Sequence, residues 1–247
     1  MIKLDWTTNP KLTPKTISEM ALYPELKEEL LFYEKNGDYP NLLLMGDTGT
    51  GKTTAARILG NLPPNHKSME IDCGQIKSDG AKGVKSLKEW IVGSQTMSID
   101  MVMEKGTGGH GKRVMILDEF HVLPTSTQSN LYKPIEMNTE TTKWIFCVNS
   151  EDKVDKPIKS RCTILYFTTC ILHHKTGKLD FLADTEMNKK SWCEELTKMA
   201  KIVEKKLDIN IADKVYERVL SKDGNLIDSR KFLQSLNKAY AMDASKD

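Results

Sequence analysis

The sequence predicts an α/β fold in which a parallel five-stranded sheet is followed by a small all-α domain. Two observations carry this prediction. Short apolar runs alternate with helical segments through the first two-thirds of the 247 residues, as in parallel sheets that are covered by helices on both faces. From residue 187 onward, the apolar residues instead recur with the spacing of a helix.

Five segments carry the strand pattern. Their consecutive residues are apolar, and strands that are buried on both faces of a parallel sheet have this composition. The stronger segments are 41–45, 113–118, 143–148 and 163–167, and the weakest is 69–72.

Helices are predicted between and after these strands. One covers 52–59, where Gly60 favours a stop, and another covers 83–92. In the last quarter of the chain, the pattern predicts a helix from 187 with Trp192, Leu196, Met199 and Val203 on one face, and two more over 212–220 and 228–241.

The change of pattern places a domain boundary near residue 168. We expect an α/β nucleotide-binding domain over 1–168, a hairpin or linker over 169–185, and a helical lid domain over 186–247.

Composition narrows the class of protein. A formal net charge of +2 does not suit a general polyanion binder, so any contact with nucleic acid needs a local patch. Five dispersed cysteines favour reduced thiols over a disulfide framework. With no apolar stretch long enough to cross a bilayer and no signal-peptide pattern, we expect a cytoplasmic protein (host cytoplasm for a viral one) without a membrane partner.

The strongest motif is Gly46-Asp47-Thr48-Gly49-Thr50-Gly51-Lys52-Thr53, which fits G-x-x-x-x-G-K-[ST] between a strand and a helix. Backbone N–H groups of such a loop surround the β-phosphate of a nucleotide. Lys52 is expected to reach the β- and γ-phosphates, and the Thr53 hydroxyl to ligate Mg²⁺. Thr54 completes the expected nucleotide-binding set.

A pair of carboxylates ends the strand at 113–118. Asp118 is expected to hold Mg²⁺, and Glu119 to orient the attacking water as general base. Ligands of open α/β sheets bind at the carboxyl ends of the strands. The sequence therefore predicts nucleotide hydrolysis at this edge.

The stretch from Asn149 to Cys162 resembles the replication factor C and phage clamp-loader families of AAA+ P-loop ATPases. The resemblance lies in an Asn that closes a strand and in a Pro-Ile-Lys-Ser-Arg-Cys segment. It implies that the nucleotide is ATP and that Asn149 is a polar sensor beside the lytic water. It also implies that Arg161 reaches the nucleotide of the neighbouring subunit.

The same resemblance extends over most of the chain. Near the start, Leu12 and Pro14 match a segment that packs around the adenine. The stretch 128–136 resembles the central coupling helix, with Pro134 inside it. In the lid, Asp228-Ser229-Arg230 resembles a Gly-Asp-x-Arg motif, which implies that Arg230 contacts the γ-phosphate.

A lysine-rich helix follows the second strand. Lys82, Lys85 and Lys88, with Lys77 before them, are candidate contacts to DNA phosphates. The alternative interpretation is an ordinary solvated helix face. Trp90, in the same helix, is expected to be a core residue.

Two other patterns carry less weight. The glycine-rich stretch 106–111 precedes a strand instead of joining a strand to a helix, so we interpret it as a loop. His173 and His174, with Cys170 nearby, point to opposite faces of a strand and lack a second pair of ligands, so we do not expect a structural metal there.

The residues themselves predict nucleotide chemistry. The resemblance implies an ATP-dependent subunit that loads a sliding clamp on primer–template DNA, together with other subunits of the loader. The alternatives are another AAA+ DNA-remodelling ATPase, such as a helicase loader or branch-migration motor, an ATP-binding assembly subunit with little turnover, and, less favoured, a P-loop kinase. The family's third, collar domain has no counterpart in the 247 residues. We therefore expect either a piece of a longer protein or a reduced relative.

Overall fold

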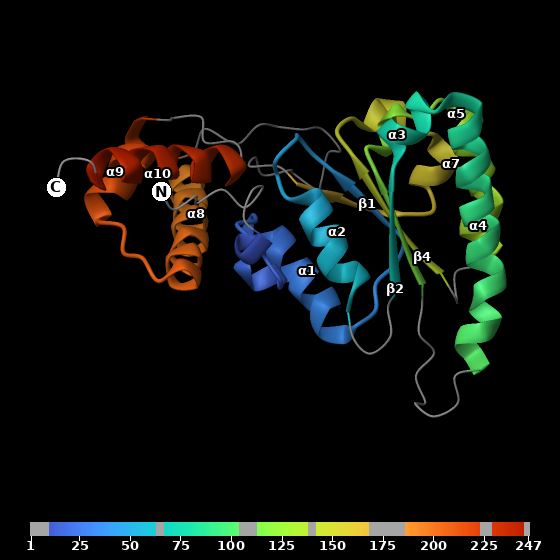
Figure 1. Ribbon diagram of the computed structural model, residues 1–247, viewed down its shortest axis with the longest axis horizontal. Helices are drawn as coiled ribbons and strands as arrows, with labels where there is room; N and C mark the ends of the chain where they lie inside the picture. Colours follow the sequence, from blue (N-terminus) through green and yellow to red (C-terminus); the bar gives the residue numbers. More distant parts are fainter. Residues whose placement is uncertain are drawn as a thin grey trace. The chain divides into compact units, whose positions relative to one another are not determined.

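The computed structural model describes residues 10–62, 67–103, 113–137, 142–167, 186–222 and 229–244. By the contacts within it, the chain forms two units (Figure 1). We call the first the helical unit and the second the sheet unit. The helical unit comprises Met1–Leu30, Asp47–Thr54 and Phe167–Asp247, and the sheet unit comprises Leu31–Gly46 and Ala55–Tyr166, each where the structure describes it.

All five strands of the sheet run parallel, in the order β2-β3-β4-β1-β5 (Figure 1). Because every strand points the same way, the polar residues that follow β2, β3 and β4 lie at one edge of the sheet. The strands are β1 (Leu42–Met45), β2 (Lys67–Asp72), β3 (Arg113–Asp118), β4 (Thr142–Val148) and β5 (Thr163–Tyr166).

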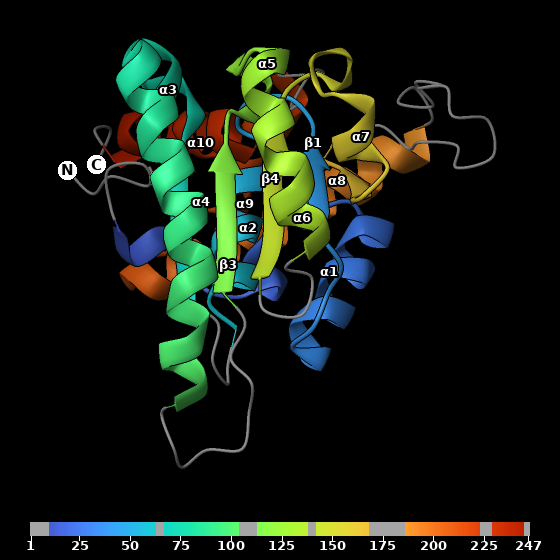
Figure 2. The same cartoon turned by 90° about the vertical axis from the view of Figure 1, so that its right-hand side faces the viewer.

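One face of the sheet packs against a continuous apolar core. Met115 and Leu117 of β3 point into it, together with Phe146 of β4. In Figure 2 this face is toward the viewer, with the long helix α4 (Gly80–Met103) running beside β3 and α6 (Tyr132–Met137) in front of β4. The helices that contribute buried residues to this core are α3 (Cys73–Ser78), α4 (Gly80–Met103), α6 (Tyr132–Met137) and α7 (Lys156–Lys159).

The opposite face of the sheet is covered by α2 (Lys52–Gly60). Gly60 lies against Val114 and Ile116, which alternate along β3 with the residues of the first core. Tyr39 donates a hydrogen bond from its hydroxyl to the carbonyl of Leu59 at 3.0 Å, which fixes the end of this helix. Burial on both faces explains why the strands are apolar at consecutive positions.

The helical unit has a core of its own. Leu196, Phe232 and Leu236 are fully buried in it. Leu12, from the short 3₁₀ helix η1 (Pro10–Leu12), belongs to the same core. Its helices are α8 (Glu186–Leu207), α9 (Asp213–Lys222) and α10 (Ser229–Ala244), and α1 (Pro24–Asn36) begins in this unit and ends in the other.

Two ion pairs tie the N-terminal segment to α8. Lys206 Nζ lies 2.7 Å from Glu19 Oε2, at the end of η2 (Ile17–Glu19). Lys27 Nζ lies 2.5 Å from Glu195 Oε2, and Lys198 reaches the other oxygen of the same carboxylate at 2.8 Å. Burial acts to raise the pKa of Glu195, but the hydrogen bonds from the two lysines outweigh it and hold that pKa below its ordinary value.

The predicted fold class is confirmed: a five-stranded parallel sheet with helices, followed by three helices. The helix predicted over 83–92 is longer than expected and extends over Gly80–Met103. Trp90 is 38% exposed, so its assignment to the core was wrong. The domain boundaries remain a prediction. The hairpin over 169–185, the loop at 106–111 and Asp228 lie outside the described residues.

The expected coupling helix at 128–136 is interrupted. Its residues divide among α5 (Thr125–Gln128), the 3₁₀ turn η4 (Ser129–Leu131) and α6. Pro134 has no N–H to donate to the preceding turn, so it is accommodated in the first turn of a new helix. No helix in the described part of the chain has the length and apolar character that crossing a membrane requires.

Candidate nucleotide site

The phosphate-loop motif begins where β1 ends. Gly46 donates its N–H to the carbonyl of Val148 at 3.2 Å, which anchors the start of the loop to β4. Gly49 and Gly51 have φ of 87° and 100°, a region that residues with a Cβ rarely adopt. A Cβ at Gly51 would also lie 2.8 Å from Met20 Cε. The glycines are therefore required by the backbone path of this loop.

Side chains of the loop bind its own backbone. Thr50 Oγ1 donates to the carbonyl of Asp47 at 2.8 Å, and Lys52 Nζ donates to the same carbonyl at 2.7 Å. Lys52 is only 7% exposed. Its ammonium group thus lies against the backbone of the loop, and its contact with phosphate oxygens stays a prediction.

The start of α10 lies against this loop within the helical unit. Ser229, which is buried, donates from its hydroxyl to the carbonyl of Gly49 at 3.3 Å. Its neighbour Arg230 has a buried Nε with no hydrogen-bond partner among the described residues. A buried donor without an acceptor is costly, and the phosphate of a nucleotide is the kind of acceptor that would satisfy it.

The residues expected around the adenine are also in this unit. Pro14 is buried, and Leu12 is 2% exposed in the core that α8, α9 and α10 form. This packing accounts for the burial of Leu12, and its contact with a base stays a prediction.

Three carboxylates lie close together at the edge of the sheet unit. Asp118 ends β3 directly beside Asp72, which ends β2 in register with it. Glu119 follows with φ 52° and ψ 33°, a left-handed conformation that costs a non-glycine residue about 1–3 kcal/mol. The N–H of Glu119 donates to Asp118 Oδ1 at 2.9 Å. Strain of this kind is common where an active site fixes the direction of a side chain.

The carboxylates of Glu119 and Asp72 both lie near Gly74, at the start of α3. A Cβ at Gly74 would lie 3.2 Å from Glu119 Oε2 and 3.0 Å from Asp72 Oδ1. Asp72 Oδ1 also accepts from the N–H groups of Gly74 and Gln75, which caps α3. Burial, and then the negative charges of all three carboxylates, raise the pKa of Cys73 far above the ordinary thiol range. This thiol is therefore a core group without a nucleophilic role.

The polar sensor predicted at Asn149 lies beside the acidic pair. It follows β4, the neighbour of β3 in the sheet. Its N–H donates to His121 Nδ1 at 3.3 Å, and His121 stands two residues after Glu119. A neutral imidazole that accepts at Nδ1 carries its proton on Nε2. His121 thus holds the backbone of Asn149 beside the segment that follows Glu119.

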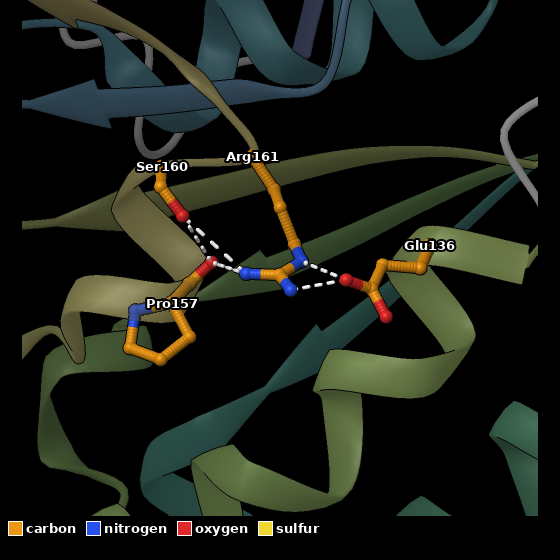
Figure 3. A network of polar contacts seen from close by, with 4 residues as sticks. All are labelled: Glu136, Pro157, Ser160 and Arg161. Atoms are coloured by element: carbon orange, nitrogen blue, oxygen red, sulfur yellow. Dashed lines mark hydrogen bonds and ion pairs between the residues drawn. The ribbon is translucent and has the colours of Figure 1, made fainter.

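Arg161 is bound within its own unit. Its guanidinium contacts Glu136 of α6, and its Nη1 donates to the carbonyl of Pro157 at 2.6 Å (Figure 3). The structure thus places Arg161 at the end of α7, beside α6.

The candidate DNA contacts lie along α4. Lys82, Lys85 and Lys88 are exposed, on the side of the helix opposite the buried Gly83 and Leu87. Lys85 makes an ion pair with Glu89 at 3.8 Å. Exposure fits both a DNA contact and a solvated face, so the DNA contacts stay a prediction.

The predicted magnesium ligands, Thr53 and Asp118, supply hydroxyl and carboxylate oxygens, which Mg²⁺ prefers. They belong to different units, and their joint use stays a prediction. No cluster of three or more histidines, cysteines or acids suited to a metal ion occurs among the residues that the structure describes. His173, His174 and Cys170 fall outside that part of the chain.

The structure therefore groups the predicted residues into two sets. The helical unit holds residues 47–53 of the phosphate loop with Ser229 and Arg230, and the sheet unit holds the acidic pair, Asn149 and Arg161. Three contacts of these residues were not predicted from the sequence, those made by Ser229, His121 and Glu136. Two of them had a signal in the sequence: His121 stands two residues after Glu119, and Ser229 lies beside Arg230 in the Asp228-Ser229-Arg230 segment.

Comparisons with known proteins show the family of this chain. Residues 42–169 match the ATPase family associated with various cellular activities (AAA). Among curated relatives, the chain is 27% identical over 179 residues to the replication factor C small subunit of Staphylothermus marinus. It is 28% identical over 181 residues to that of Picrophilus torridus.

These matches cover 71% and 73% of this chain, but 51% and 54% of the relatives. The chain thus spans about half the length of the curated relatives that it matches.

Solved structures show the same fold. Domain III of the Thermotoga maritima replication initiation protein DnaA has a TM-score of 0.60 at 14% identity, covering 94% of this chain and 90% of that one. A mutant of Thermotoga maritima RuvB has a TM-score of 0.59 at 18% identity, covering 96% and 68%. With a phosphate loop, an acidic pair and a family match over residues 42–169, this chain belongs to the ATPase family associated with various cellular activities (AAA).

Proposed function

We propose that this chain is an ATPase subunit of a sliding-clamp loader. The observation that carries the proposal is the similarity to replication factor C small subunits over 71% of the chain. The Ser160-Arg161-Cys162 segment adds to it, since clamp-loader subunits are expected to act on one another through this segment.

The helical unit supplies the groups that bind ATP. Lys52 and the N–H groups of the phosphate loop contact the phosphates, and Arg230 gives its buried Nε to the γ-phosphate. Mg²⁺ neutralises charge on the phosphates when it is bound, and Thr53 and Asp118 are the residues that would hold it.

The sheet unit supplies the groups for hydrolysis. Glu119 takes a proton from the attacking water, and the backbone at this residue has the left-handed conformation that is found where an active site fixes a side chain. Asn149 hydrogen-bonds the same water, and its backbone is held by His121. These groups fix the geometry of attack, and precise positioning is the main source of rate in phosphoryl transfer.

Arg161 acts on the nucleotide of a neighbouring subunit. A guanidinium stabilises the charge that develops on the γ-phosphate in the transition state, with an effect of about 10³–10⁵ on the rate in related ATPases and GTPases. Hydrolysis then depends on assembly. Lysines of α4 hold the phosphates of primer–template DNA, and ATP binding and hydrolysis drive placement of the clamp.

The test is steady-state ATP hydrolysis over a range of protein concentrations, with and without a primer–template duplex and a sliding clamp. The proposed function predicts that the rate per molecule rises with protein concentration, duplex and clamp. Glu119→Gln gives the background.

A rate that stays at the Glu119→Gln background under every condition would instead indicate an ATP-binding assembly subunit. A rate that rises with DNA but ignores the clamp would indicate another AAA+ DNA-remodelling ATPase.

A further inference from the structure

All three guanidinium nitrogens of Arg161 are engaged within its own chain (Figure 3). Nε donates to Glu136 Oε1 at 3.1 Å, and Nη2 donates to the same oxygen. Nη1 donates to the carbonyl of Pro157 at 2.6 Å and to Ser160 Oγ at 3.3 Å. The side chain is 29% exposed. Arg161 is thus folded back between α6 and α7.

The edge of the guanidinium that Glu136 occupies is one that a phosphate would also use. Carboxylates and phosphates both bind arginine through paired N–H groups on one edge of the guanidinium plane. While Glu136 holds Nε and Nη2, those donors are not available to a phosphate. The carboxylate also offsets the positive charge that would stabilise a transition state.

The position of Glu136 is fixed by its own helix. Tyr132, one turn earlier in α6, donates from its hydroxyl to Asp155 Oδ2 at 2.7 Å. Asp155 directly precedes α7, which leads to Arg161. The hydrogen bond from Tyr132 to Asp155 is therefore a second contact between the segment that carries Glu136 and the segment that carries Arg161.

We propose that Glu136 is a positioning residue that holds Arg161 in a retracted state. This pair has to open before Arg161 acts on the nucleotide of a neighbouring subunit. The inference rests on the proposed function in one respect, the action of Arg161 between subunits. Glu136 then sets how readily assembly switches hydrolysis on.

The expected size of this effect is modest. The side chain of Glu136 is 52% exposed, and exposed ion pairs shift an equilibrium by about two- to five-fold. Contacts with a neighbouring subunit can reverse a preference of that size. The ion pair between Glu136 and Arg161 therefore retains Arg161 reversibly and opens when a neighbouring subunit binds.

The test compares two variants that each neutralise one carboxylate of an arginine pair. Glu136→Gln removes the charge that holds Arg161 and keeps the shape of the side chain. Glu70→Gln is the matched control, because Glu70 binds Arg57 in the same unit at 2.7 and 2.6 Å and lies outside the proposed site. The readout is ATP hydrolysis against protein concentration, with primer–template DNA.

We expect Glu136→Gln to lower the protein concentration at half-maximal rate about two- to five-fold and Glu70→Gln to leave it unchanged. The gain should vanish in Glu136→Gln combined with Arg161→Ala, because the effect acts through Arg161. A second readout is the rate at which phenylglyoxal modifies Arg161, followed by mass spectrometry. That rate should rise in Glu136→Gln only.

Slower or unchanged hydrolysis in Glu136→Gln, an equal gain in Glu70→Gln, or an unchanged rate of Arg161 modification would overturn the role of Glu136. Each of these leaves the proposed function standing. If Arg161→Ala alone hydrolyses ATP as fast as the unaltered chain, then Arg161 does not act on the nucleotide of a neighbouring subunit. That result would overturn both this part of the proposed function and the inference about Glu136.

Discussion

The helical unit and the sheet unit position polar groups in different ways. In the sheet unit, Asp72, Asp118 and Asn149 are placed by strand ends, whose relation is fixed by parallel hydrogen bonding. In the helical unit, the start of α10 contacts the phosphate loop through a side chain, where the hydroxyl of Ser229 donates to the carbonyl of Gly49. Strand ends that hydrogen bonds fix suit groups that must align reacting atoms. A side-chain contact that can break suits groups that open and close around a ligand.

The proposed function assigns ATP binding to the helical unit and hydrolysis to the sheet unit. The largest effect should come from variants that separate the two. Lys52→Ala removes a phosphate contact and should weaken ATP binding. Glu119→Gln removes the general base and should lower the rate of hydrolysis by about 10²–10⁴ while ATP still binds.

The measurement is nucleotide affinity by fluorescence or calorimetry, beside single-turnover hydrolysis. Equal loss of affinity in both variants would break the assignment, because Glu119 would then be a binding residue as much as Lys52.

A smaller effect is expected at the contact between α3 and α4. A Cβ at Gly83 would lie 2.3 Å from the carbonyl oxygen of Ile76, so Gly83→Ala must move backbone. Overpacking of this kind costs about 1–3 kcal/mol. Denaturant unfolding should show the loss of stability in the sheet unit, and hydrogen exchange should locate it there.

Gly80→Ala is the matched control for this variant, because nothing lies within 4 Å of a Cβ at that position, where only the positive φ of 57° adds strain. If hydrogen exchange shows the larger loss in the helical unit, the two units do not unfold as separate bodies.

The smallest effect should appear in the helical unit. Glu195→Gln removes the charge that Lys27 and Lys198 bind, and we expect a loss of about 1 kcal/mol at neutral pH. Because the pKa of Glu195 is lowered in the folded chain, its contribution is present above the ordinary glutamate pKa of about 4.3. It is lost as the pH falls through the lowered value.

The difference in stability between Glu195→Gln and the unaltered chain should therefore shrink with acid, as measured by urea unfolding from pH 7 to pH 3. Glu194→Gln, next to it on α8, is the control, and it should show little change at either pH. A difference that grows in acid would contradict the lowered pKa.

The elements that sequence analysis found are those with strong local signals. The strand at 113–118 was predicted with the bounds that the structure has, because four consecutive buried residues leave little choice of structure. The phosphate loop was also found from a local signal, because its short turn needs positive φ and its sequence supplies glycines at those positions. These features depend on residues that are near one another in the chain.

The features that were missed depend on contacts over long distances in the sequence. His121 and Asn149 are 28 residues apart, and Glu136 and Arg161 are 25 apart. Each pair meets only because β3 lies beside β4 or α6 beside α7, and no local pattern specifies that. Trp90 was misplaced because a large aromatic residue suggests burial, whereas α4 leaves it 38% exposed.

The most direct test of shared catalysis is a mixing experiment with two inactive variants. Arg161→Ala keeps Glu119, and Glu119→Gln keeps Arg161. If Arg161 acts between subunits, mixed assemblies contain sites that combine Glu119 of one chain with Arg161 of its neighbour. Random mixing in equal amounts should then restore hydrolysis to about a quarter of the unaltered rate, because the interface is head-to-tail. A mixture that stays at the level of the separate variants would contradict the proposed function, since Arg161 would then serve the site of its own chain.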